Sequence, residues 1–174
     1  MKKYLTGILP IMLIFFIGNT MSALAQEDIE KHPSCKYCGM DRTKFAQSRM
    51  YVEYSDGSSS GTCSLHCAAM DLALTIDKTP DKMMAGDYNS KKLIDSETAV
   101  WVIGGKKQGV MTKRAKWAFE KAEDAEAFMA ENGGEKANFD GAMKAAYEDM
   151  HSDTKMIREK RKMMKQKTME HKHQ

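Results

Sequence analysis

The chain has 174 residues, of which 42% are hydrophobic and 29% are charged. This length allows a domain with a buried core, so a chain that is disordered throughout is excluded. The only long apolar run lies at the N-terminus, which excludes a membrane protein with many spans. The net charge of +3 is uneven, because residues 155–174 hold eight Lys/Arg and two acidic residues, whereas residues 26–154 sum to −5. The basic excess lies in an end segment without aromatic residues, so nucleic-acid binding is not expected.

The N-terminal segment has the pattern of a secretory signal peptide. Two lysines precede an uncharged stretch whose most apolar part, residues 8–17, is interrupted by Pro10 and is shorter than the roughly 20 residues of a membrane span. Ala23-Leu24-Ala25 matches a small-x-small cleavage site, so we expect residues 1–25 to be removed. The mature chain would then be exported, into the periplasm of a Gram-negative source, with no stable membrane span. No cysteine lies near the cleavage site, so lipid attachment is not expected.

Hydrophobic patterning predicts an α+β domain behind a polar leader at 26–34. The first half of this domain is predicted to contain a strand at 49–54, a turn at 56–61, a helix at 64–76 with Ser64 as N-cap, and a strand at 83–88.

The second half repeats this order. Strands are expected at 99–103 and 116–119, a helix at 122–131, and a short strand near Phe139. Residues 35–140 therefore read as two ββαβ-like units. A packed helix is predicted at 141–154, because Met143, Ala146, Tyr147 and Met150 share one helical face. The charged tail at 155–174 is expected to be helical or disordered.

The cysteines form two pairs rich in soft ligands. The first segment, Cys35-Lys-Tyr-Cys38-Gly-Met40, holds two thiols and a thioether, and the second, Cys63-Ser-Leu-His66-Cys67, holds two thiols and an imidazole. Thiolates and thioethers suit Cu(I), whereas four thiolates suit Zn²⁺. The start of the predicted helix would also favour thiolate at Cys63 and Cys67.

Other uses of four cysteines stay open from the spacing alone. An exported chain can hold two disulfides, which would make the domain a structural module for interactions. Cys-x-x-Cys is also a thiol-redox motif, although here it does not follow a strand and open a helix. The tail methionines and the histidines His171 and His173 could collect copper transiently, but a solvated charged helix end is the plainer interpretation.

Several further motifs resemble the NosL family. Tyr37-Cys38-Gly39-Met40, then Trp101-Val-Ile-Gly-Gly105, Gly109-Val-Met111 and Lys116-Trp-Ala-Phe119 follow one another as in that family, over about 35–139. The resemblance implies an exported, non-enzymatic Cu(I) chaperone that delivers copper to nitrous oxide reductase. It also implies a fold of two ββαβ units related to the organomercurial lyase MerB.

Carried over residue by residue, the resemblance implies Cu(I) ligands at Cys38, Met40 and Met111. Two features depart from the family pattern. Typical members resemble lipoproteins, whereas no lipidated cysteine is expected here. Cys35, Cys63, His66 and Cys67 are additional, and their second segment is similar to the metal knuckle of TRASH and YHS domains. We therefore expect a second or extended site there, with Zn²⁺ at the four cysteines as one option. The alternative function is a thiol-based enzyme, organomercurial-lyase-like or thiol-disulfide, with Cys38 as nucleophile.

Overall fold

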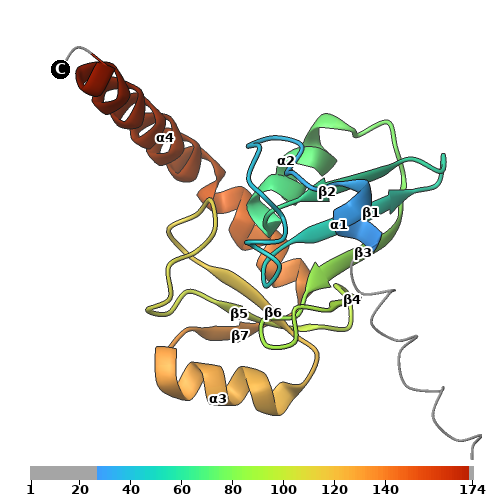
Figure 1. Cartoon of the computed structure of the whole chain (residues 1–174). Coiled ribbons are helices and arrows are strands. Elements are labelled where there is room, and N and C mark those ends of the chain that lie inside the picture. Colours follow the sequence, from blue (N-terminus) through green and yellow to red (C-terminus); the bar gives the residue numbers. More distant parts are fainter. Residues whose placement is uncertain (1–26, 173–174) are drawn as a thin grey trace, which may run out of the picture.

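Two small antiparallel sheets and a long C-terminal helix make up the α+β fold of this protein (Figure 1). The computed structural model describes residues 27–172. The expected signal peptide, residues 1–25, lies outside the described residues. A short helix, α1 (Glu27–Lys31), precedes the first sheet.

The first sheet is built around β1, with strand order β2-β1-β3-β4. The helix α2 lies between β2 and β3 in the chain, and one of its faces is buried. The elements of this unit are β1 (Met50–Tyr54), β2 (Ser59–Thr62), α2 (Leu65–Leu74), β3 (Pro80–Gly86) and β4 (Leu93–Asp95).

The second sheet has the order β6-β5-β7, which matches β2-β1-β3 position by position. The two expected ββαβ units are therefore confirmed, with β4 added to the first. The second unit contains β5 (Val100–Ile103), β6 (Lys116–Phe119), α3 (Ala122–Asn132) and β7 (Glu135–Ala137). The chain ends in α4 (Phe139–Lys172), which continues as one helix through the charged tail.

Three local predictions were wrong. Residues 59–61, expected within the turn at 56–61, belong to β2, because this segment of small polar residues pairs with β1 through its backbone. The short strand β4 was not expected at all. The strand predicted near Phe139 ends at Ala137, and Phe139 instead begins α4, where its ring packs 5.8 Å from that of Trp101.

The core has two parts, and the second surrounds the sulfur ligands. The first joins α2, α4 and both sheets through small side chains such as Ala69, Ala142 and Ala146, which let the helices approach closely. The second contains Cys35, Cys63 and Cys67 among the aromatic residues of the second unit. Within residues 27–172, no helix combines the length and the apolar character needed to cross a bilayer.

Candidate metal centre

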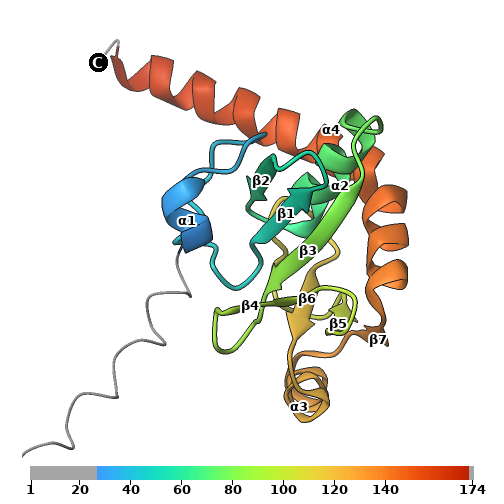
Figure 2. The same cartoon turned by 90° about the vertical axis from the view of Figure 1, so that its right-hand side faces the viewer.

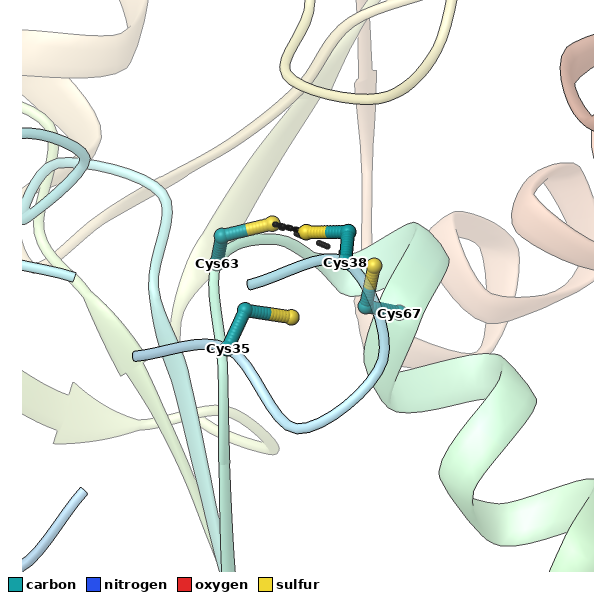
Figure 3. A group of neighbouring side chains, drawn as sticks. All are labelled: Cys35, Cys38, Cys63 and Cys67. Atoms are coloured by element: carbon teal, nitrogen blue, oxygen red, sulfur yellow. Dashed lines mark hydrogen bonds between the residues drawn. The ribbon is translucent and has the colours of Figure 1, made fainter. Parts of the chain in front are cut away.

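Four cysteine side chains converge at one point between the first sheet, α2 and the loop before β1. The Sγ atoms of Cys35, Cys38, Cys63 and Cys67 all lie within 4.8 Å of one another (Figure 3). The Sγ atom of Cys63 is 3.4 Å from that of Cys38 and 3.9 Å from that of Cys67. All four are free thiols. The structure thus unites the two predicted cysteine pairs, which are separated by 24 residues in the chain.

Backbone hydrogen bonds bend the first cysteine segment into a tight loop. The N–H of Cys35 donates to the carbonyl oxygen of Met40 at 2.8 Å, and the N–H of Gly39 donates to the carbonyl oxygen of Cys35 at 2.9 Å. Gly39 has φ 75, a left-handed conformation that glycine adopts without strain. The Cys-Gly-Met sequence therefore turns Cys38 and Met40 toward the same side of the molecule as the second pair.

The second pair lies where β2 leads into α2. Ser64 has extended backbone geometry and precedes the first helical residue, as expected for an N-cap, but its side chain makes no capping hydrogen bond. Cys63 and Cys67 are 0% and 1% exposed, whereas Cys38 is half-buried. Cys38 is therefore the thiol of the cluster that solvent and an incoming ion can reach.

The thiols of the cluster have pKa values that are shifted in opposite directions. Hydrogen bonds from Cys38, Cys63 and Cys67 strongly lower the pKa of Cys35. The pKa values of Cys63 and Cys67 are raised, because these buried thiols donate to Cys35 and Cys38. The helix start was expected to favour thiolate at Cys63 and Cys67; within the cluster, their hydrogen bonds to Cys35 and Cys38 shift their pKa values in the opposite direction.

The pKa of Cys38 is also lowered. Its hydrogen bond with Cys35 acts in the opposite direction, but hydrogen bonds from Cys63 and Cys67 outweigh that effect. The most accessible thiol of the cluster is therefore prepared to bind a soft metal ion as thiolate.

A buried carboxylate, which sequence reasoning missed, fastens the cysteine loop to α2. Asp71 accepts hydrogen bonds from the Nζ of Lys36 at 2.8 Å, from the Tyr37 hydroxyl, and from the Tyr54 hydroxyl at 2.6 Å. Lys36 and Tyr37 are the two residues between Cys35 and Cys38. Asp71 lies one helical turn after Cys67 in α2. Because it binds the two residues between Cys35 and Cys38, it fixes the first cysteine pair in position relative to the second.

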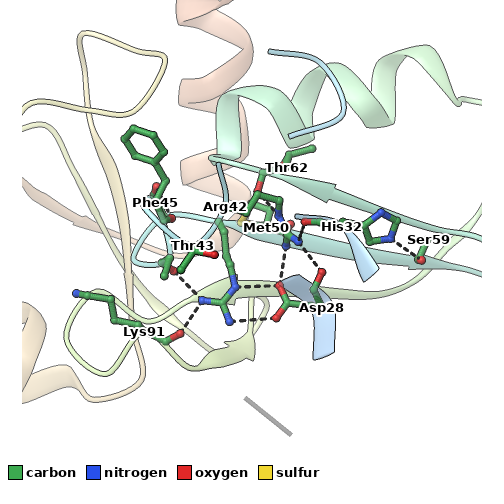
Figure 4. Close-up of polar contacts among 12 residues, drawn as sticks. Asp28, His32, Arg42, Thr43, Phe45, Met50, Ser59, Thr62 and Lys91 are labelled. Carbon is green, nitrogen blue, oxygen red and sulfur yellow. Dashed lines mark hydrogen bonds and ion pairs between the residues drawn. The ribbon is translucent and has the colours of Figure 1, made fainter. Parts of the chain in front are cut away.

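A second buried ionic group links α1 to the loop before β1 and to the end of β2 (Figure 4). The carboxylate of Asp28 lies 2.7 Å from the Nη2 of Arg42 and 2.9 Å from the Nε of Arg49. Arg42 also donates to the carbonyl oxygen of Thr62, the residue before Cys63. The polar segment at 26–34 thus contributes a buried side chain to the fold, which periodicity of apolar residues could not indicate.

Met111 lies in the loop between β5 and β6 and has an unusual backbone. Its φ is 60, in the left-handed region where residues other than glycine are uncommon and where strain costs on the order of 1–3 kcal/mol. The loop is fixed to α4, because the N–H of Lys113 donates to Asp153 at 3.1 Å and Arg114 pairs with Asp149 at 2.9 Å. These bonds tie the loop that carries Met111 to α4.

Cys38, Met40 and Met111 line one groove of about 890 Å³. The groove lies between the cysteine loop, the loop before β6 and α4. Met156 and Met164 of α4 line it as well. The three residues implied as Cu(I) ligands are therefore brought to one cavity, and two of the tail methionines join them.

His66 does not belong to the cluster of four thiols. It is buried in α2, with its Nδ1 3.5 Å from the Oδ2 of Asp153 in α4, and burial lowers its pKa, so the ring is neutral near pH 7. Cys63 and Cys67 thus point to the cluster, whereas His66 packs against α4.

Comparisons with known proteins gave a structural similarity and a family match. No curated protein matches the chain. The chain is similar to the crystal structure of the copper chaperone NosL from Shewanella denitrificans, with a TM-score of 0.49 and 22% identity, over 62% of this chain and 87% of that one. A sequence profile of the NosL family matches residues 26–147, more than half of the chain. The protein is therefore a member of the NosL family.

Proposed function

We propose that this protein is an exported copper chaperone that binds Cu(I) in the groove and passes it to a copper-receiving enzyme or its maturation complex. Nitrous oxide reductase is the acceptor that the family resemblance implies. The observation that carries the proposal is that Cys38, Met40 and Met111, from loops far apart in the chain, line a single groove. In this proposal, residues 35–140 form the metal-binding domain, behind a signal peptide at 1–25.

The ligands of the groove suit the cargo. A thiolate and thioethers are soft donors that hold Cu(I) and discriminate against hard cations such as Mg²⁺ or Ca²⁺. Cys38 supplies the negative charge, and hydrogen bonds from Cys63 and Cys67 lower the pKa of its thiol, which favours the thiolate. Because the groove is open to solvent, an acceptor can add its own ligand before the last bond to Cys38 breaks. Copper stays Cu(I) throughout, and each new Cu–S bond replaces an old one.

An anaerobic titration of the reduced protein against a chromophoric Cu(I) chelator tests this proposal. We expect one tightly bound Cu(I), with affinity lowered at least ~10–100-fold by Cys38→Ser or Met111→Leu, since loss of even outer-shell partners has effects of that size. Met169→Leu is the matched control, because Met169 is about half exposed and does not line the groove. Unchanged affinity in both groove variants would refute the assignment.

Delivery and export need their own measurements. Copper-loaded protein mixed with copper-free nitrous oxide reductase should load the enzyme, and no transfer would remove this acceptor from the proposal. N-terminal sequencing of the mature protein should begin at Gln26. Turnover of a disulfide or an organomercurial substrate that is abolished by Cys38→Ser would instead favour the thiol-based enzyme.

The four thiols support a second candidate, a structural Zn²⁺ site. A tetrahedral site with Zn–S bonds of about 2.3 Å has Sγ atoms about 3.8 Å apart, close to the 3.4 and 3.9 Å found here. Zn²⁺ bound by Cys35, Cys38, Cys63 and Cys67 would link the cysteine loop to α2. Zinc analysis of the purified protein tests this: Cys35→Ser should remove zinc, whereas Met111→Leu should leave the zinc content unchanged.

A further inference from the structure

The helix α4 brings two methionines to the groove from outside the region that matches the family. The family profile ends at residue 147, and α4 continues to Lys172. Figure 2 shows this second part of the helix running past the loop that carries the first cysteine pair. Arg161 donates to the carbonyl oxygen of Cys38 at 3.4 Å, so the helix touches the site directly.

The residues of α4 that face the groove recur every turn. They are Met156, Ile157, Lys160, Arg161 and Met164, which have the spacing of one helical face. Met156 is half-buried beside the groove, and Met164 lies two turns further out with 61% of its surface exposed. The two thioethers therefore lead from the interior of the groove toward solvent.

Packing alone does not explain Met164. A methionine contributes to a hydrophobic core by removing its surface from water, and a side chain that is 61% exposed gains little in this way. Cys38, Met40, Met111, Met156 and Met164 together give the groove five sulfur donors, more than the four of a tetrahedral site. Because the groove has more soft ligands than one Cu(I) ion needs, the ion can change ligands without leaving the protein.

The positive charge around the groove favours binding through neutral, soft ligands such as thioethers. Lys113, Lys160 and Arg161 also line it, and these cations oppose the approach of a hard, hydrated metal ion that is attracted only by charge. These cations repel Cu(I) as well, so the Cu–S bonds have to supply the attraction, and neutral thioethers are soft donors that form such bonds.

We propose that Met156 and Met164 are further Cu(I) ligands, which form an uptake and release site beside Cys38, Met40 and Met111. This inference rests on the proposed function of the groove. Copper passes between the two sets by exchange: one Cu–S bond to a thioether forms as another breaks, and the ion keeps its oxidation state. Removing the two α4 thioethers should therefore slow the movement of copper more than it weakens final binding.

Methyl NMR of the full chain labelled at the methionine methyl groups tests the inference directly. On addition of Cu(I), the signals of Met156 and Met164 should shift together with those of Met40 and Met111, while that of Met169 stays in place. Shifts confined to Met40 and Met111 would overturn the inference and leave the proposed function standing. No shift in any of the four groove signals would overturn both.

Kinetics with matched variants completes the test. In Met156→Leu/Met164→Leu, leucine keeps the bulk and the helix propensity but removes the sulfur. We expect Cu(I) transfer to a chelator to slow about tenfold or more, and equilibrium affinity to fall less than in Met111→Leu. Met163→Leu/Met169→Leu, which replaces two exposed methionines that do not line the groove, should transfer copper at the unaltered rate. Equal rates in the two double variants would contradict the assignment.

Discussion

Replacing Asp71 by asparagine should destabilise the fold by about 3 kcal/mol. The Asp71 side chain is fully buried, and the hydroxyl groups of Tyr37 and Tyr54 donate to its carboxylate. Asparagine replaces one carboxylate oxygen with an NH2 group that cannot accept, so one of these hydrogen bonds is lost and the other loses its charged acceptor. A hydrogen bond to a charged group contributes roughly 1.5–3 kcal/mol, so the two effects together give about 3 kcal/mol. The ion pair with Lys36 adds little, because the lysine side chain is 48% exposed.

Urea unfolding of the metal-free, reduced protein measures this change. A loss of about 3 kcal/mol is a large part of the 5–15 kcal/mol typical of a domain. Asp77→Asn is the matched control, since Asp77 follows the same helix but is exposed, and its change should stay within about 0.5 kcal/mol. If both variants unfold at the same urea concentration, Asp71 does not anchor the cysteine loop as argued.

The pH dependence gives an independent check on Asp71. Burial raises its pKa, but hydrogen bonds from Lys36, Tyr37 and Tyr54 outweigh burial, so the pKa lies below the ordinary 3.8. A carboxyl whose pKa is lowered by folding stabilises the protein above pH 3.8, and this contribution is lost as the pH falls through the lowered value. The stability difference between the unaltered protein and Asp71→Asn should therefore be constant near neutral pH and narrow below pH 3.8.

Three further predictions concern the supports of the site. Asp28→Asn should lower stability in urea by about 3–5 kcal/mol, because it leaves two buried arginines short of their counter-ion, and exposed Glu27→Gln should not. Gly39→Ala and Gly57→Ala should each reduce stability by about 1 kcal/mol, since both glycines have positive φ and open space around them, but only Gly39→Ala should weaken Cu(I) binding in the chelator assay. Free Zn²⁺ at a hundredfold excess over its Kd should raise the free energy of unfolding by about 2.7 kcal/mol, and Cys35→Ser should abolish this gain.

The periodic elements were predictable from the sequence, because their side chains repeat with the pitch of a helix or the alternation of a strand. The strand at Val100–Ile103 and the helix at Ala122–Asn132 were found within a residue or so. β2 was missed, because Ser59–Thr62 has neither bulk nor alternation and becomes a strand only by pairing with β1. Such pairing depends on tertiary structure, which local β-propensity does not predict.

Candidate metal ligands could be proposed from the sequence by their chemistry, but the residues that hold them in place could not. Thiols and thioethers near one another in the chain indicate a soft-metal site, whereas an aspartate in a helix looks like any surface charge. Asp71 and Asp28 become informative only when burial and their partners are known. The left-handed conformation of Met111 likewise lies in a loop that contacts α4, more than thirty residues away in the chain, and no local sequence pattern indicates it.

Cys38 belongs to two arrangements at once, and this decides how the protein can hold metal. Its Sγ is 3.4 Å from that of Cys63, inside the thiol cluster, and the same residue lines the groove with Met40 and Met111. A Zn²⁺ ion in the cluster would use the Cys38 thiolate as a ligand. The bond from Cys38 to Cu(I) would then be weaker. Without zinc, the other thiols polarise Cys38 through their hydrogen bonds. In the proposed function, zinc in the cluster and copper in the groove would both use Cys38, so binding of one metal should lower the affinity for the other.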